Sequence, residues 1–327
     1  MNKLFRPSCV AGLMLALTIS YARAQAPAPQ AIGTQPIEPQ QFMRFYDGGE
    51  RGQSLQTAEV TYRNAAGQTV RLVGAIHIAE REYYEHLNGE FAADDAVLYE
   101  LVKPKDAGVP TPGVEAPPSG NPISTVQHLM KDVLNLSFQL DVIDYTKPNF
   151  VHADLDKETF EKLQQERGET FEDMILKQLM AAFTQPPPQQ ADGQDGSQTI
   201  DQLVAALTRP DGEHQIKLIL AKQMDDMQKG GKGFDVMAGT VILGERNKAA
   251  LKVLTETLGQ GKRRISIFYG AAHMPDMAEH LRAMGFTPVS CRWNTAWDLT
   301  IRADQPSAME KLISEVMKQL GSGDDQK

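Results

Sequence analysis

One five-residue pattern ends two apolar runs in this chain, and it restricts the folds that the chain can adopt. Val73-Gly-Ala-Ile-His77 ends the first run, and Tyr269-Gly-Ala-Ala-His273 ends the second. Each run predicts a buried strand, each glycine predicts a tight turn, and helical spacing follows both patterns. Ligands of α/β proteins bind outside the carboxyl ends of parallel strands. We therefore expect His77 and His273 to share one edge of a sheet.

A third apolar run, Ala96-Val-Leu-Tyr-Glu100, ends in a carboxylate. A buried hydrophobic strand has no structural use for a charge at its end, because burying an unpaired carboxylate is costly. We predict that Glu100 faces the same pocket as the two histidines. The predicted fold class is α/β, with a mixed, mainly parallel sheet built from two related strand-helix units and a helical insertion between the halves.

The first 24 residues have the three parts of a secretory signal peptide. Basic residues precede an apolar stretch, and Ala22-Arg23-Ala24 supplies the small residues of a cleavage site. We expect export to the periplasm or the medium, cleavage after Ala24, and no stable membrane anchor afterwards. A Pro/Ala/Gln-rich segment at 25–41 is predicted to be a disordered tether, and 321–327 a disordered tail.

The charge of the mature chain excludes one class of partner. Removing the three basic residues of the signal peptide from the 33 in the chain leaves 30, against 42 Asp and Glu, so the net charge is about −12. An acidic protein without a basic stripe is not expected to bind nucleic acid. Cys291 is then the one remaining cysteine, so no intramolecular disulfide can form and stability must come from the core.

The rest of the chain, 42–320, is long enough for a single α/β domain. Helical spacing predicts the insertion at about 123–229. A proline-rich loop at 103–122 precedes it, and a low-complexity linker at 185–198 interrupts it.

A long helix is predicted from Val236 to Leu258, with Arg246 and Asn247 in its interior. The apolar residues around Arg246 indicate burial, and a buried arginine needs a carboxylate partner, which is either Glu100 or a substrate terminus. Asn247 is expected to hold a ligand backbone or a turn. Asp154 follows a short apolar run and is expected to cap a helix.

These motifs resemble those of the TraB/PrgY/GumN family, which includes the Tiki-type metalloproteases. The resemblance covers about residues 60 to 300, and the motifs that carry it are Gly74-x-x-His77, Glu100, Glu245-Arg246-Asn247, Gly270-x-x-His273 and Leu281-x-x-x-Gly285-Phe286. It implies an α/β fold with internally repeated units, distantly similar to the erythromycin-esterase and ChaN groups. For Tiki-type members it implies a divalent-metal peptidase, whose matching residues here are His77, Glu100 and His273, acting on a peptide or protein.

Elementary chemistry leads to the same residues without the resemblance. Two imidazoles and one carboxylate can hold a divalent metal and leave a position for water, whose pKa the metal lowers to about 7. Imidazole and carboxylate ligands suit Mn, Co or Zn alike. The predicted metal ligands are His77, Glu100 and His273, and the predicted catalytic set adds Arg246 and Asn247.

Two alternatives to the metal-dependent hydrolase of peptide or amide bonds stay open. In the first, one histidine is a general base that Glu100 orients, as in a metal-free esterase. In the second, the chain binds a peptide or small signal and turns nothing over. A serine hydrolase is not expected, because the chain has no Gly-x-Ser-x-Gly pattern.

Overall fold

The computed structural model describes residues 37–49, 52–113, 134–168, 205–206, 209, 211–229, 241–300 and 313. The chain divides into two units, Met1–Gln35 and Pro36–Lys327, and every described residue belongs to the second. The predicted signal peptide, most of the predicted tether, the linker at 185–198 and the tail lie outside the described residues. The described part of the proline-rich loop, 103–113, forms turns and one isolated bridge, with no helix or strand.

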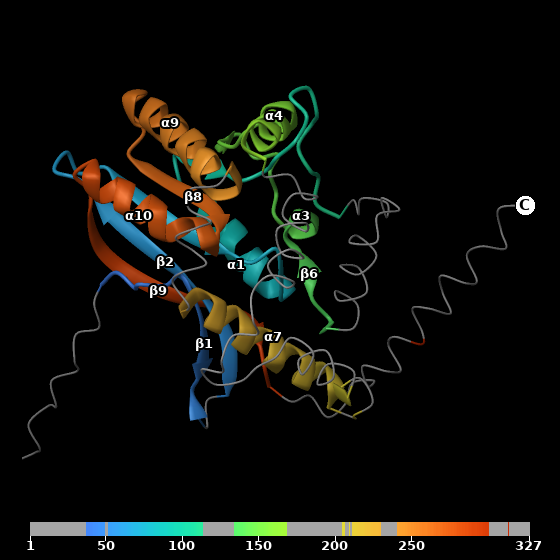
Figure 1. Ribbon diagram of the computed structural model, residues 1–327. Coiled ribbons are helices and arrows are strands. Elements are labelled where there is room, and N and C mark those ends of the chain that lie inside the picture. The colour runs from blue at the N-terminus through green and yellow to red at the C-terminus, as the bar shows by residue number, and fades with distance from the viewer. Residues whose placement is uncertain are drawn as a thin grey trace, which may run out of the picture. The chain divides into compact units, whose positions relative to one another are not determined.

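A seven-stranded mixed sheet forms the centre of the described unit (Figure 1). Its strands are β1 (Met43–Asp47), β2 (Gln53–Arg63), β3 (Thr69–Ala75), β5 (Ala96–Tyr99), β7 (Phe150–His152), β8 (Arg264–Gly270) and β9 (Thr287–Asp298). The four strands β3, β8, β5 and β7 lie in this order and run parallel. Strand β2 pairs antiparallel with β1, with β9 and with β3, and the pair with β3 joins these strands to the parallel ones. The predicted fold class, α/β with a mixed, mainly parallel sheet, is confirmed.

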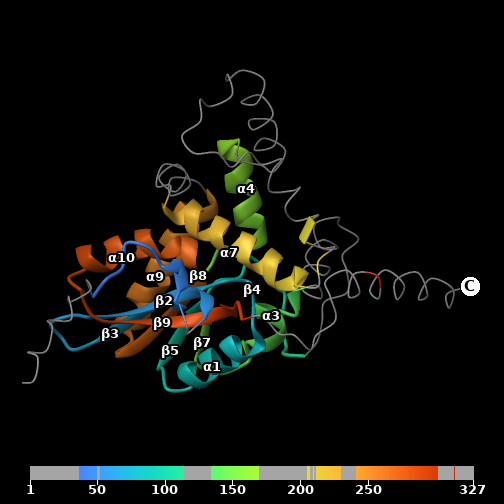
Figure 2. The same cartoon turned by 90° about the horizontal axis from the view of Figure 1, so that it is seen from below.

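Helices cover both faces of this sheet. Helix α1 (Arg81–Phe91) lies on one face, and α9 (Arg246–Gly259) and α10 (Met274–Ala283) lie on the other (Figure 2). Successive strand side chains point to opposite faces, so Val73 packs in the cluster that contains α1 and Leu72 in the cluster that contains α9 and α10. Each fully buried leucine or phenylalanine contributes about 1.5–3 kcal/mol, so both clusters hold the strand ends in place.

The predicted insertion, 123–229, is helical only in part. Its described residues form β6 (Ser137–Phe138), which pairs with β4 (Ile78–Ala79), then α3 (Gln139–Val142), β7, α4 (Lys157–Arg167) and α7 (Gly212–Lys229). Strand β7 adds an edge to the main sheet beside β5. The short strands β6 and β7 were not predicted, because two or three residues of apolar pattern are too few to separate a strand from a helix by periodicity.

The predicted helix from Val236 to Leu258 also differs. Residues Val241–Glu245 form a π-helical turn, η2, and the α-helix begins at Arg246. Arg246 is thus the first residue of the α-helical part, and it lies within a continuous helical segment from Val241 to Gly259, as predicted. A π-helical turn widens the backbone spiral, which changes the direction in which the following side chains leave the helix.

Helix α7 packs against β1 and is held by a buried ion pair. Lys217 Nζ lies 3.0 Å from Glu80 Oε1 and 3.2 Å from Glu213 Oε1. In the part of the chain that the structure describes, no helix combines the length and apolar character needed to cross a membrane.

Candidate functional site

The three predicted strand-end residues meet at one edge of the sheet. His77 follows β3, Glu100 follows β5, and His273 ends the short helical turn η3 (Ala271–His273) after β8. Strand β8 lies between β3 and β5, and all three run parallel, so their carboxyl ends are neighbours. The topology therefore delivers all three side chains to the same place.

Gly270 is the point around which these side chains gather. A β-carbon on Gly270 would lie 3.4 Å from Glu100 Oε2, 3.7 Å from His273 Cδ2 and 3.8 Å from His77 Nε2. All three atoms surround this one point, so any two of them lie within twice 3.8 Å of each other. His273 Nε2 also lies 3.6 Å from Glu100 Oε1. The absence of a side chain at Gly270 keeps the space between the three groups open.

Glu100 is buried and both of its oxygens accept hydrogen bonds. Oε1 accepts from Arg246 Nη2 at 2.7 Å, and Oε2 accepts from the main-chain N–H of Gly270 at 2.6 Å. Burial opposes ionisation of this carboxyl, but the imidazole of His273 and the guanidinium of Arg246 outweigh burial and hold its pKa below the usual range. Glu100 is therefore a fixed negative charge at neutral pH.

Arg246 joins Glu100 to a second buried carboxylate. Its Nε donates to Asp154 Oδ1 at 2.9 Å and its Nη2 to Asp154 Oδ2 at 2.6 Å. Burial lowers the pKa of the guanidinium, yet Asp154 and Glu100 outweigh burial and raise it, so Arg246 stays cationic. Of the two partners predicted for Arg246, the structure shows Glu100, and it adds Asp154.

Asp154 does not cap a helix, so that prediction is wrong. Its carboxylate is fully buried beside Arg246, and its one local contact is with the N–H of the next residue, Leu155. The helix cap is Asp156, whose side chain accepts from the N–H of Thr159 at the start of α4. Asp156 directly precedes the helical spacing at Lys157 to Arg167, which predicts it as the N-cap, and the structure confirms this; the inward turn of Asp154 has no such local signal.

The imidazole of His273 is fixed by Asn247. Asn247 Nδ2 donates to Asp276 Oδ2 at 2.7 Å, which leaves Asn247 Oδ1 to face His273 Nδ1 at 2.6 Å. An amide oxygen only accepts, so Nδ1 of His273 carries a proton, and Nε2 is the ring nitrogen on the side of Glu100, where a neutral ring would present a lone pair. Asn247, predicted to hold a ligand backbone or a turn, instead holds His273.

His77 has a corresponding partner that the sequence did not reveal. Its Nδ1 lies 3.3 Å from Oε1 of Gln139, in α3, and Gln139 Nε2 donates to Tyr145 Oη at 2.8 Å. Gln139 is 62 residues away from His77 in the chain and lies in the predicted insertion. No local pattern around Gln139 distinguishes it from a surface glutamine, so only the pairing of β4 with β6 could have identified it.

The donor chemistry of the site fits a divalent metal in two respects. Nδ1 of His273 is taken by Asn247, which leaves Nε2 as the ring nitrogen that could bind a metal, and Nε2 of His77 lies in the same space. Each oxygen of Glu100 keeps a second lone pair beside its hydrogen bond. As the side chains stand, however, no group of three or more His, Cys, Asp or Glu in the described ranges has its donor atoms arranged to hold a metal ion.

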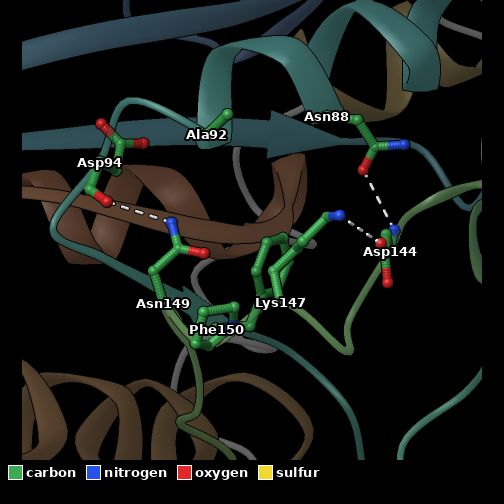
Figure 3. A pocket seen from close by; sticks show the side chains of 8 residues that line it. Asn88, Ala92, Asp94, Asp144, Lys147, Asn149 and Phe150 are labelled. Atoms are coloured by element: carbon green, nitrogen blue, oxygen red, sulfur yellow. Dashed lines mark hydrogen bonds and ion pairs between the residues drawn. The ribbon is translucent and has the colours of Figure 1, made fainter.

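A hollow elsewhere in the fold does not contain these residues (Figure 3). Its volume is about 630 Å³, and it is lined by Asn88, Ala92, Asp94, Asp144, Lys147, Pro148, Asn149 and Phe150. Asp94 precedes β5 and Phe150 begins β7, so the hollow lies near the amino ends of strands whose other ends lead to the site. Its polar side chains form hydrogen bonds within the fold. Asn149 Nδ2 donates to two main-chain oxygens, and Asn88 Oδ1 accepts from the main-chain N–H of Asp144.

Comparison with protein-family models, curated proteins and solved structures finds no match for this chain. The likeness to the TraB/PrgY/GumN family thus rests on the motifs themselves.

Proposed function

We propose that this protein is an exported hydrolase that activates water between His77, Glu100 and His273 and acts on peptide or amide bonds. One observation carries the proposal. Nδ1 of His273 is held by Asn247, so that Nε2 lies 3.6 Å from the ionised carboxylate of Glu100, with Nε2 of His77 in the same space. When both rings are neutral, their Nε2 lone pairs and this carboxylate repel one another unless a cation or a polarised water lies between them.

Each residue has a distinct part in this proposal. His273, with Nδ1–H fixed by Asn247, accepts a proton from water at Nε2. Glu100 stabilises the positive charge that the imidazole then carries. Arg246 and the N–H of Gly270 hold the carboxylate still. A divalent metal held by His77, His273 and Glu100 would instead occupy the Nε2 lone pair of His273, which would then be a ligand and not the base, and the metal would lower the pKa of bound water and polarise the substrate carbonyl.

Metal analysis is the first test. The mature protein, purified without a metal-affinity tag, is expected to contain about one divalent metal per chain. His77→Ala, His273→Ala and Glu100→Gln should each lower the metal content, because loss of one of three ligands weakens binding strongly. His86→Ala, which removes an exposed imidazole on α1, is the matched control and should change nothing.

Turnover is measured separately. Peptide mixtures incubated with the protein are expected to yield new amino termini by mass spectrometry, and the His273→Ala variant should yield none. Metal that persists at full stoichiometry in the His77→Ala, His273→Ala double variant would exclude the proposed ligands. Absence of turnover on peptides, amides and esters alike would leave the binding-protein alternative.

A metal-free hydrolase is the second candidate, and the hydrogen bonds of Glu100 favour it. Arg246 and the main-chain N–H of Gly270 already donate hydrogen bonds to that carboxylate and stabilise it without any metal. This candidate expects activity that resists chelators and a protein without stoichiometric metal. The assays above distinguish the two candidates directly.

Export is a separate part of the proposal and is supported by the sequence of residues 1–24 alone. Amino-terminal sequencing of the protein recovered from the periplasm or medium should begin at Gln25. Recovery of a cytoplasmic protein that begins at residue 1 would contradict it.

A further inference from the structure

The ring of His77 is held at two points by a single residue. Gln139 Oε1 lies 3.3 Å from His77 Nδ1, and the main-chain N–H of Gln139 donates to the carbonyl oxygen of His77 at 2.9 Å. Gln139 is buried, with 4% of its surface exposed, where β6 passes into α3. The two contacts fix the main chain of His77 and its imidazole together.

The orientation of the Gln139 amide follows from its other neighbour. Nε2 donates to Tyr145 Oη at 2.8 Å, so Oε1 is the atom that faces His77. Burial raises the pKa of Tyr145, so its hydroxyl stays neutral and keeps lone pairs to accept with. An amide oxygen cannot donate, and the contact therefore requires the proton of a neutral His77 to be on Nδ1.

The same arrangement occurs at His273. There Asn247 Oδ1 accepts from Nδ1, Asn247 Nδ2 lies 3.4 Å from the carbonyl oxygen of His273, and Asp276 fixes the amide. The two amides come from unrelated parts of the chain, α3 and α9. In a neutral ring, each contact leaves Nε2 as the nitrogen without a proton, and both rings lie beside Gly270. A side chain that served only to fill the core would not need to match this polarity.

We propose that Gln139 is a positioning residue for His77: it fixes the Nδ1–H tautomer of that imidazole and so directs the Nε2 lone pair toward Glu100 and Gly270. This inference deepens the proposed function, on which its purpose rests. Its measurement requires neither turnover nor metal, so the two can fail independently.

The tautomer can be read by nuclear magnetic resonance of the full mature chain with ¹⁵N-labelled histidine, after chelation of metals. Protonated and unprotonated ring nitrogens have well-separated resonances, and the seven histidines of the chain are few enough to resolve. His77→Gln and His273→Gln assign the two rings of the site. The wild-type protein should show His77 with its proton on Nδ1 alone.

Two substitutions at Gln139 separate its hydrogen bond from its volume. Gln139→Met keeps the size but removes the acceptor, so His77 should lose the pure Nδ1–H form and give a mixture of tautomers. Gln139→Glu keeps an acceptor at the same place and should retain Nδ1–H. Asn247→Leu is the reciprocal control: it should release His273 and leave His77 unchanged, whereas Gln139→Met should leave His273 unchanged.

A wild-type His77 that carries its proton on Nε2 would overturn the inference, and so would a Gln139→Met variant in which the Nδ1–H form persists. If Gln139→Met does not fold, the spectra of the wild type and of Gln139→Glu still show whether His77 carries its proton on Nδ1. Tautomers that respond as expected in a protein without metal or turnover would support the positioning role and refute the proposed function.

Discussion

Replacing Arg246 with methionine would leave two buried carboxylates without their cation. Arg246 is 11% exposed, Glu100 7% and Asp154 fully buried. Methionine preserves most of the volume of the side chain, so loss of charge dominates the effect. Breaking a buried ion pair by removing one partner costs about 3–5 kcal/mol, because the remaining charge stays in a medium of low polarity. We expect the free energy of unfolding of Arg246→Met to fall by about that amount at pH 7.

Urea unfolding followed by circular dichroism measures this loss, and Arg81→Met is the matched control. Arg81 makes one ion pair, with Glu85 on the same helix, and its side chain is 62% exposed. Exposed pairs of this spacing contribute about 0.3–0.5 kcal/mol. A loss in Arg246→Met no larger than in Arg81→Met would refute the conclusion that Arg246 stabilises buried charge.

The pH dependence adds a second check with a definite sign. The pKa of Glu100 is lower in the folded protein than in the unfolded chain, where it is about 4.3. Its ionised form therefore stabilises the fold above about pH 4.3, and this contribution is lost as the pH falls from there toward the folded pKa. Without Arg246 the pKa of Glu100 is lowered less, so the difference between wild type and variant should narrow below about pH 4.

Three further changes test individual contacts. Gly74→Ala should lower the free energy of unfolding by about 1–3 kcal/mol, because its β-carbon would lie 3.2 Å from the main-chain oxygen of Ala58. Gly270→Ala, in contrast, should leave thermal stability nearly unchanged and reduce turnover. Lys217→Met should cost about 3 kcal/mol and speed hydrogen exchange in α7, because Glu80 loses its buried cation. Tyr145→Phe should weaken the Nδ1–H preference of His77, measured by the same ¹⁵N spectra, because Gln139 Nε2 loses its acceptor. Equal melting temperatures for Gly74→Ala and Gly270→Ala would contradict the first expectation. Unchanged hydrogen exchange in α7 of Lys217→Met would contradict the second, and an unchanged spectrum of Tyr145→Phe the third.

The sequence was sufficient to predict the residues that strands deliver directly. His77, Glu100 and His273 each end a short apolar run, and a run of four to seven residues predicts a buried strand from local information. Parallel strands then place their carboxyl ends side by side. Each step depends on residues that are close in the chain, so local patterns are enough to predict that the three groups assemble.

The partners of these residues could not be predicted in the same way. Gln139, Asp154 and Asp276 reach the site through contacts between distant segments, and glutamine or aspartate in a polar stretch is usually a surface residue. Asp154 and Asp156 are two residues apart, and their roles differ because the backbone after β7 turns one carboxylate toward Arg246. Tertiary register, which local patterns do not encode, decided these cases.

The repeated pattern also concealed a difference that only packing shows. A β-carbon at Gly74 would lie 3.2 Å from the main-chain oxygen of Ala58, which is tighter than ordinary contact, while one at Gly270 would enter the space among Glu100, His77 and His273. The first glycine is required by close packing and the second by the open site. Equal motifs in a sequence therefore do not imply equal roles, and the two histidines need not be interchangeable either.

The charges around the site bear on which ligand it can hold. Arg246 carries one positive charge, but it donates from Nε and Nη2 to Asp154 and Glu100, which together carry two negative charges. With both imidazoles neutral, this group of side chains is negative by one charge. Such a site attracts a cation, and it repels the carboxylate terminus that the sequence left open as a partner for Arg246. This charge supports the proposal of a cation, either a divalent metal or the positively charged part of a substrate, beside Nε2 of His273.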